Sequence, residues 1–62
     1  MNRQEKRNWE INIENAVAAA TTKAGADVVK SLFRRYDARN LYDLSHCYYS
    51  EAFADLQQVI ND

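Results

Sequence analysis

The chain has 62 residues, a formal net charge of −1, one cysteine, one glycine and no proline. A domain this short buries only about 60% of the surface that its unfolded chain exposes, so its margin of stability is small. One cysteine excludes an intramolecular disulfide, and one cysteine with one histidine is too few for the four ligands of a structural zinc. Stability therefore has to come from helix packing, within the chain or across a homodimer or partner interface.

The composition predicts an all-α fold, a three-helix bundle that forms a single domain over residues 1–62. Nothing in a chain with one glycine and no proline marks the turns of β-hairpins. The longest stretch without charge, residues 15–22, is far shorter than the ~20 apolar residues that span a bilayer. No apolar segment of signal-peptide length follows the charged amino end. We therefore expect a cytoplasmic protein that does not enter a membrane.

The first predicted helix covers residues 3–20. Its apolar side chains recur at every third or fourth position from Trp9 through Ile13 to Ala20, while the charged residues mostly avoid that stripe. Ile11 lies off the stripe. The sequence leaves open whether Trp9 and Ile11 face the core or another chain.

The second predicted helix covers residues 23–36, with Thr21 or Thr22 as its N-cap. Its apolar stripe comprises Val28, Val29, Leu32, Phe33 and Tyr36. The helical pattern stops after Tyr36, where Asp37 and Asn40 tolerate the left-handed backbone that often follows a helix.

A short helical turn is predicted at residues 41–44, with Asn40 as its cap and two leucines, Leu41 and Leu44, directed into the core. The third predicted helix covers residues 45–60 and begins with Ser45 as its N-cap. Its apolar stripe comprises Tyr49, Ala52, Phe53, Leu56, Val59 and Ile60. Tyr48 is predicted to project from a different side of this helix.

An aspartate, a serine, the only histidine and the only cysteine lie within five positions at the start of this third helix. Successive helical residues point about 100° apart, so His46 and Cys47 diverge instead of meeting as a nucleophile and its base. No glycine-rich phosphate loop, HExxH sequence or paired zinc-ligand motif is present. We predict a protein that is not an enzyme, with no cofactor, no metal and no small-molecule substrate.

Charge is distributed unevenly along the chain. Residues 1–42 contain eight Lys or Arg and five Asp or Glu, whereas residues 43–62 contain four Asp or Glu and no Lys or Arg. Three tyrosines also cluster around the start of the acidic segment, and tyrosine is enriched at protein interfaces. The sequence predicts a surface for a basic protein partner at Tyr42, Tyr48, Glu51 and Asp55. The alternative is an ordinary solvated face with surface tyrosines.

A second functional hypothesis is DNA binding. Lys30, Arg34, Arg35 and Arg39 form a local basic group on and after the second helix. Three helices also resemble helix-turn-helix proteins in outline. The chain, however, has a pI of about 5.7 and an acidic last helix, which suits a phosphate-lined groove poorly. Nucleic acid is therefore the weaker of the two predicted partners.

The run "VVKSLFRRYDARNLYDLSHCYYSEAFADLQQV" resembles a small helical module found in proteins of bacterial conjugative elements and phages. The shared features, over residues 24–60, are an apolar helix ending in aromatic-x-Ala, then "LYDLS", then a tyrosine-bearing helix. The module often has glycine where this chain has Asp37. The resemblance implies an accessory or inhibitory protein of a mobile genetic element that acts by binding another protein, and it implies no catalytic residues.

Overall fold

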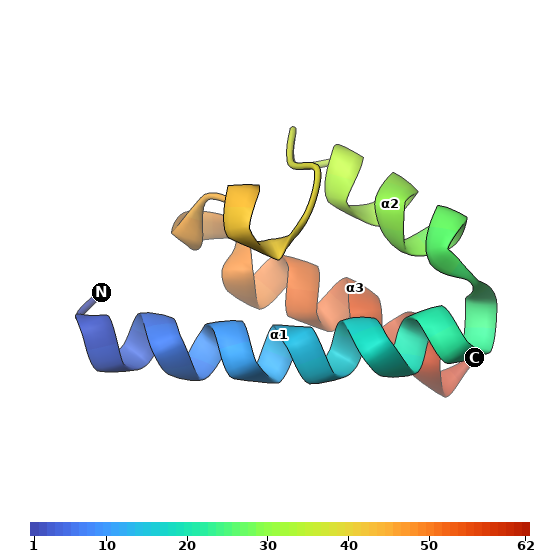
Figure 1. Ribbon diagram of the computed structural model, residues 1–62, viewed down its shortest axis with the longest axis horizontal. Helices are drawn as coiled ribbons and strands as arrows, with labels where there is room; N and C mark the ends of the chain where they lie inside the picture. The colour runs from blue at the N-terminus through green and yellow to red at the C-terminus, as the bar shows by residue number, and fades with distance from the viewer.

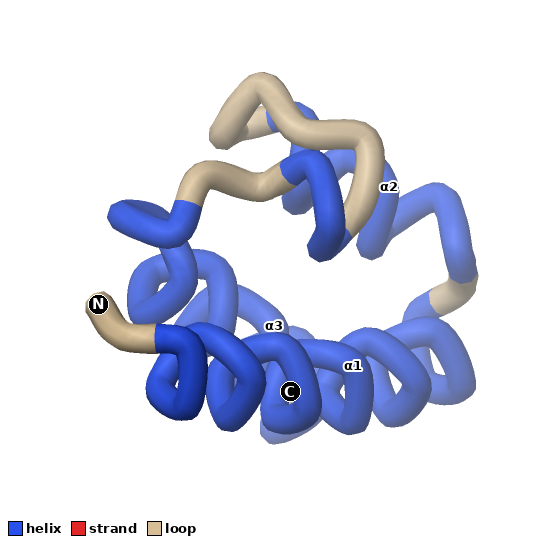
Figure 2. Tube along the Cα trace, turned by 60° about the vertical axis from the view of Figure 1, so that its left-hand side comes forward, coloured by secondary structure: helices blue, strands red, loops and turns tan.

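The computed structural model describes residues 1–62 and consists of three α-helices and two short 3-10 helices, without strands. The elements are α1 (Arg3–Ala24), α2 (Ala26–Arg34), η1 (Leu41–Asp43), η2 (His46–Tyr48) and α3 (Tyr49–Asn61). Helices α1 and α3 lie side by side, and α2 with the two 3-10 helices lies on one side of this pair (Figures 1 and 2). The molecule measures 32 × 20 × 14 Å. The predicted all-α, three-helix bundle is confirmed, and no helix is long and apolar enough to cross a membrane.

Helix α1 begins at a capped end and runs further than its sequence pattern predicted. The Asn2 side chain accepts a hydrogen bond from the Glu5 backbone N–H at 2.8 Å. At the other end Thr22 stays helical, and its hydroxyl donates to the Ala18 carbonyl at 3.0 Å. The prediction that a threonine caps α2 is therefore wrong. The two helices are separated by Gly25, whose φ of 97° and ψ of 158° are a combination open almost only to glycine.

Helix α2 ends in a hydrogen-bonded turn that carries the chain back toward the core. The Asp37 N–H donates to the Arg34 carbonyl at 3.1 Å, and the Ala38 N–H donates to the Phe33 carbonyl at 3.2 Å. Asp37 has a φ of 57°, so it takes the left-handed position that glycine commonly occupies in this Schellman arrangement. Of the two residues named for the left-handed backbone, Asp37 adopts it, whereas Asn40 is extended with a φ of −159°. The helix proper ends at Arg34 because the next two residues belong to its cap.

The short turn before α3 is organised by Asn40. Its side-chain oxygen accepts from the N–H groups of Tyr42 and Asp43, at 2.8 and 3.1 Å. This cap fixes η1 so that Leu41 and Leu44 are 4% and 5% exposed, as the sequence predicted, while Tyr42 faces solvent.

One apolar core joins all the elements. Its twelve buried residues are Ile13, Ala16, Ala20, Val29, Leu32, Phe33, Ala38, Leu41, Leu44, Tyr49, Ala52 and Leu56. Trp9 packs on α3, with its ring centroid 6.0 Å from that of Phe53 and 6.4 Å from that of Tyr49. Trp9 therefore faces the bundle, whereas Ile11 is 40% exposed.

The predicted stripe of α2 needs one correction. Val28 is 42% exposed although it was assigned to the core, whereas its neighbour Val29 is 6% exposed. A nine-residue helix presents one narrow side to its neighbours, and here Val29, Leu32 and Phe33 occupy it. Val28 is left at the edge facing α3, where it lines a cleft described below.

Candidate protein-binding surfaces

The polar residues just before α3, Asp43, Ser45, His46 and Cys47, do not come together as one cluster of side chains. Ser45 was predicted to cap the third helix, but its hydroxyl makes no capping hydrogen bond and lies 3.2 Å from the Cys47 sulfur. The first turn is a 3-10 helix, so its tighter winding differs from the α-helical cap that was expected. Ser45 therefore occupies the predicted N-cap position, but of η2, and its side chain does not cap the helix. His46 is exposed and its ring makes no hydrogen bond, and no group of three metal-ligating side chains exists in the chain.

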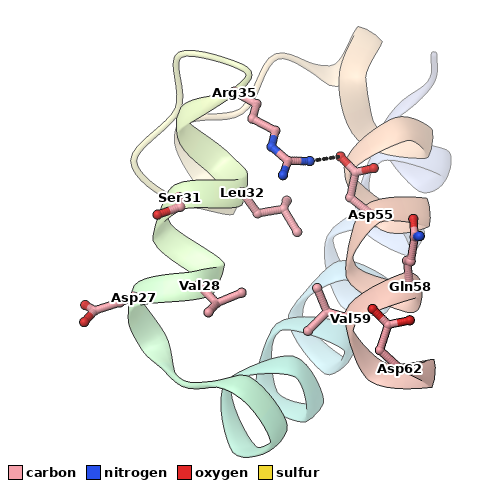
Figure 3. A pocket seen from close by; sticks show the side chains of 9 residues that line it. All are labelled: Asp27, Val28, Ser31, Leu32, Arg35, Asp55, Gln58, Val59 and Asp62. Carbon is pink, nitrogen blue, oxygen red and sulfur yellow. Dashed lines mark ion pairs between the residues drawn. The ribbon is translucent and has the colours of Figure 1, made fainter.

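The largest hollow is an open cleft of about 490 Å³ between α2 and α3, called here the acidic groove. It is lined by Asp27, Val28, Ser31, Leu32, Arg35, Asp55, Gln58, Val59 and Asp62. Val28 and Leu32 of α2 point across the groove toward Val59 of α3 and form its apolar floor (Figure 3). The start of α2 lies near the end of α3, so the two helices run in opposite directions along the groove.

Three carboxylates lie in one row on α3 and its C-cap. Glu51, Asp55 and Asp62 are separated by four and seven positions, spacings that put them on one side of an α-helix, and Asp55 and Asp62 line the groove while Glu51 lies one turn before Asp55. We call these three residues the acidic stripe. Asp27 adds a fourth carboxylate on α2, but its side chain points away from the cleft (Figure 3). The only cation lining the groove is Arg35, so the charge there is predominantly negative.

Asp55 is held in place by residues of α2 and its cap. Its Oδ2 accepts a hydrogen bond from the Tyr36 hydroxyl at 2.5 Å and lies 3.9 Å from Nη1 of Arg35. The hydrogen bond to Asp55, together with burial and the negative charges of Asp55 and Glu51, raises the pKa of Tyr36 to about 12, and Arg35 opposes this rise. Asp55 was predicted to contact a partner, but its carboxylate already joins α3 to α2.

Of the two adjacent tyrosines at the start of α3, one is buried and the other is exposed, as predicted. Tyr49 is 3% exposed, and burial followed by the charge of Glu10 raises its pKa. Tyr48 is 38% exposed, and its ring packs against Tyr36 in a tilted arrangement with centroids 5.1 Å apart. This pair of rings stands where Tyr36 reaches Asp55, at one end of the acidic groove.

Tyr42 lies at a different hollow from the rest of the predicted surface. It is 67% exposed and borders a hollow of about 230 Å³ between α1, α2 and η1, called here the basic groove. The lining residues are Glu14, Val17, Val29, Lys30, Phe33, Arg39, Asn40, Leu41 and Tyr42. Tyr48, Glu51 and Asp55 are not among them, so the predicted four-residue surface is divided.

The basic residues proposed for DNA binding also lie at two different places on the surface. Lys30, Arg34 and Arg39 border one further hollow of about 250 Å³ over the buried Ala38, next to the basic groove. Arg35 instead faces the acidic groove and makes the chain's only ion pair, with Asp55. Consecutive residues of a helix point in different directions, so the side chains of Arg34 and Arg35 lie on different sides of α2.

Sequence reasoning missed Val28, Val59 and Tyr36 as surface residues and Asp62 as part of an acidic row. The signal for this row was available in the sequence, in the four- and seven-residue spacings of Glu51, Asp55 and Asp62. The positions of Val28, Val59 and Tyr36 depend on how α2 packs on α3, which the 14-residue connection between the two helices does not predict. Comparison of the chain with models of protein families, with curated proteins and with solved structures finds no match.

Proposed function

We propose that this protein is a non-enzymatic protein-binding domain whose acidic groove receives a basic, amphipathic segment of its partner. The observation that carries the proposal is the groove itself: an apolar floor of Val28, Leu32 and Val59 beside the acidic stripe. An amphipathic helix laid in such a groove buries its apolar side chains and leaves its cations beside the carboxylates. Charge complementarity of this kind supplies specificity and speeds association.

Two features support a preformed site. Tyr36 and Arg35 fix the Asp55 carboxylate, so a partner cation meets a charge that is already oriented. Tyr48 packs against Tyr36, which bonds to Asp55, and so offers an aromatic surface beside the end of the groove. Rigid tyrosines of this kind are frequent anchors in interfaces. The resemblance to modules of mobile genetic elements leads us to propose further that the partner is a protein of the host or the element, and that binding serves an accessory or inhibitory role in the cytoplasm.

The test uses a synthetic helical peptide as long as α3, with leucines at every third or fourth position and lysines between them. Glu51→Gln with Asp62→Asn removes two carboxylates of the acidic stripe and leaves Asp55 and its contacts intact. Each exposed carboxylate–lysine pair contributes about 0.2–1 kcal/mol, so the double variant should weaken binding by about 2- to 30-fold. Fluorescence anisotropy of the labelled peptide measures this change.

The matched control is Glu5→Gln with Glu10→Gln, which removes the same charge from α1. Neither residue lines the acidic groove, so binding should change by less than about twofold. Equal weakening in both double variants would show a general charge effect and contradict the proposal. Equal affinity for a peptide with glutamates in place of the lysines would contradict it as well.

A further inference from the structure

We infer that the basic groove is a second docking site, for an acidic segment of another protein that inserts a large apolar side chain. This inference goes beyond the proposed function, because it concerns another side of α2 and a partner of opposite charge. Val28, Leu32 and Arg35 face the acidic groove, whereas Val29, Lys30 and Phe33 face the basic one. The helix thus separates two surfaces of different chemistry.

The basic groove has an apolar interior. Val17, Val29, Phe33 and Leu41 line it from three different elements. Its volume of about 230 Å³ lies below the range of roughly 300–1,000 Å³ that is usual for small-molecule sites. A hollow of this size and lining suits one apolar side chain that anchors a longer peptide, as anchor residues do at protein interfaces.

The rim of the groove carries cations that no internal carboxylate neutralises. Lys30 and Arg39 line the groove, Arg34 stands at the adjoining hollow, and none of the three lies within 4.0 Å of a carboxylate oxygen. Glu14 is the only acidic residue of the lining. An acidic segment is therefore expected to lie with its carboxylates toward Lys30 and Arg39 and away from Glu14.

The outer edge of the groove is ordered before any partner arrives. The Arg39 backbone N–H donates to Asp43 Oδ2 at 3.0 Å, and the Asn40 cap fixes the two residues that follow Leu41. These bonds hold Tyr42 at the rim with 67% of its surface exposed. A tyrosine fixed in this way adds contact area at little cost in conformational entropy.

An acidic protein segment fits these observations better than nucleic acid does. Phosphates would leave the apolar interior unfilled, and Glu14 would repel them from one wall. The fourth cation of the DNA hypothesis, Arg35, is paired with Asp55 at the other groove.

The experiment selects peptides from a random library displayed on phage, using the full chain as bait and the Lys30→Glu, Arg39→Glu double variant for counter-selection. Peptides retained only by the unaltered protein are expected to combine several Asp or Glu with a Phe, Leu or Trp. In isothermal titration the double variant should bind the enriched peptide at least about tenfold more weakly, because attraction becomes repulsion at two positions. Glu14→Gln should strengthen binding, and no enrichment of acidic peptides would overturn the inference.

The control is Arg3→Glu with Lys6→Glu, which changes the net charge equally but lies about 12 Å or more along α1 from Glu14. Affinity for the acidic peptide should change by less than about twofold in this control, because that distance exceeds the Debye length at physiological salt. Equal losses in the two double variants would overturn the inference. Circular dichroism verifies that both variants remain folded.

Two further measurements identify other occupants. Tighter binding of a duplex DNA than of the acidic peptide, lost in the Lys30→Glu, Arg39→Glu variant, would overturn the inference in favour of nucleic acid. Concentration-dependent self-association in sedimentation, lost in the same variant, would overturn it in favour of a second copy. The Lys30→Glu, Arg39→Glu variant is expected to bind the basic peptide at the acidic groove as the unaltered protein does. This result distinguishes a failure of the second docking site from a failure of the proposed function.

Discussion

Replacing Tyr36 by phenylalanine tests the contact that fixes the acidic groove. The change removes one hydroxyl, whose hydrogen bond to Asp55 at 2.5 Å joins the end of α2 to α3. The ring remains and keeps its contact with Tyr48. Hydrogen bonds to charged groups contribute about 1.5–3 kcal/mol, and the 29% exposure of the Asp55 side chain reduces this to about 1 kcal/mol.

The contribution of the Tyr36–Asp55 hydrogen bond to stability depends on pH, and the raised pKa of Tyr36 determines the direction of this dependence. The pKa of Tyr36 rises from 10.0 to about 12 on folding, so the folded protein holds the phenolic proton more tightly than the unfolded chain. Stabilisation is complete below about pH 10 and is lost as the pH rises toward about 12. The full shift corresponds to at most about 2.7 kcal/mol, and solvent screening of this partly exposed pair lowers it to about 1 kcal/mol.

Urea unfolding of the wild type and Tyr36→Phe between about pH 8 and pH 11 measures the effect. The two free energies of unfolding should differ by about 1 kcal/mol at the lower pH and by about half as much at the higher. Tyr42→Phe is the control, because the Tyr42 hydroxyl makes no hydrogen bond within the chain and its loss should change nothing. A difference that is independent of pH, or the same loss in Tyr42→Phe, would refute the reasoning.

Four further substitutions test the fold, each by thermal and urea unfolding followed by circular dichroism. Val29→Ala should cost about 2 kcal/mol and Val28→Ala less than about 1 kcal/mol, because only Val29 is buried; equal costs would mean that the orientation of α2 is wrong. Gly25→Ala should cost about 1–3 kcal/mol through its backbone conformation, since an added Cβ meets no atom within 4 Å; an unchanged midpoint would contradict that conformation. Asn40→Ala should cost about 0.5–2 kcal/mol by removing the cap of η1, and wild-type stability would show that the cap contributes nothing.

Local patterns predicted much of this fold because they reflect local physics. The apolar spacing of the first helix, the cap at Asn40 and the left-handed residue at Asp37 each depend on a few neighbouring residues. The break between the first two helices was misplaced because threonine and glycine compete as breakers. Thr22 satisfies its hydroxyl inside the helix, and Gly25 alone adopts the required backbone.

The candidate surfaces depended on packing that no local pattern contains. Val28 and Val29 both fit an apolar stripe, and only the position of α3 decides which of them is buried. The sequence suggested that Asp55 is a free acidic residue, because its partners Arg35 and Tyr36 lie twenty and nineteen positions away in the chain. The sequence identified which residues carry the charges of these surfaces. Only the three-dimensional structure shows how those residues are divided between the two grooves.

The most direct test of the central claim is to map where a basic amphipathic peptide binds. Titration of the isotope-labelled protein with that peptide, followed by amide NMR spectra, should shift the signals of Val28, Ser31, Gln58 and Val59, which line the acidic groove. The signals of Val17 and Leu41, at the basic groove, should remain in place. Shifts confined to the basic groove, or no shifts at saturating peptide, would contradict the claim that the acidic groove binds a basic partner.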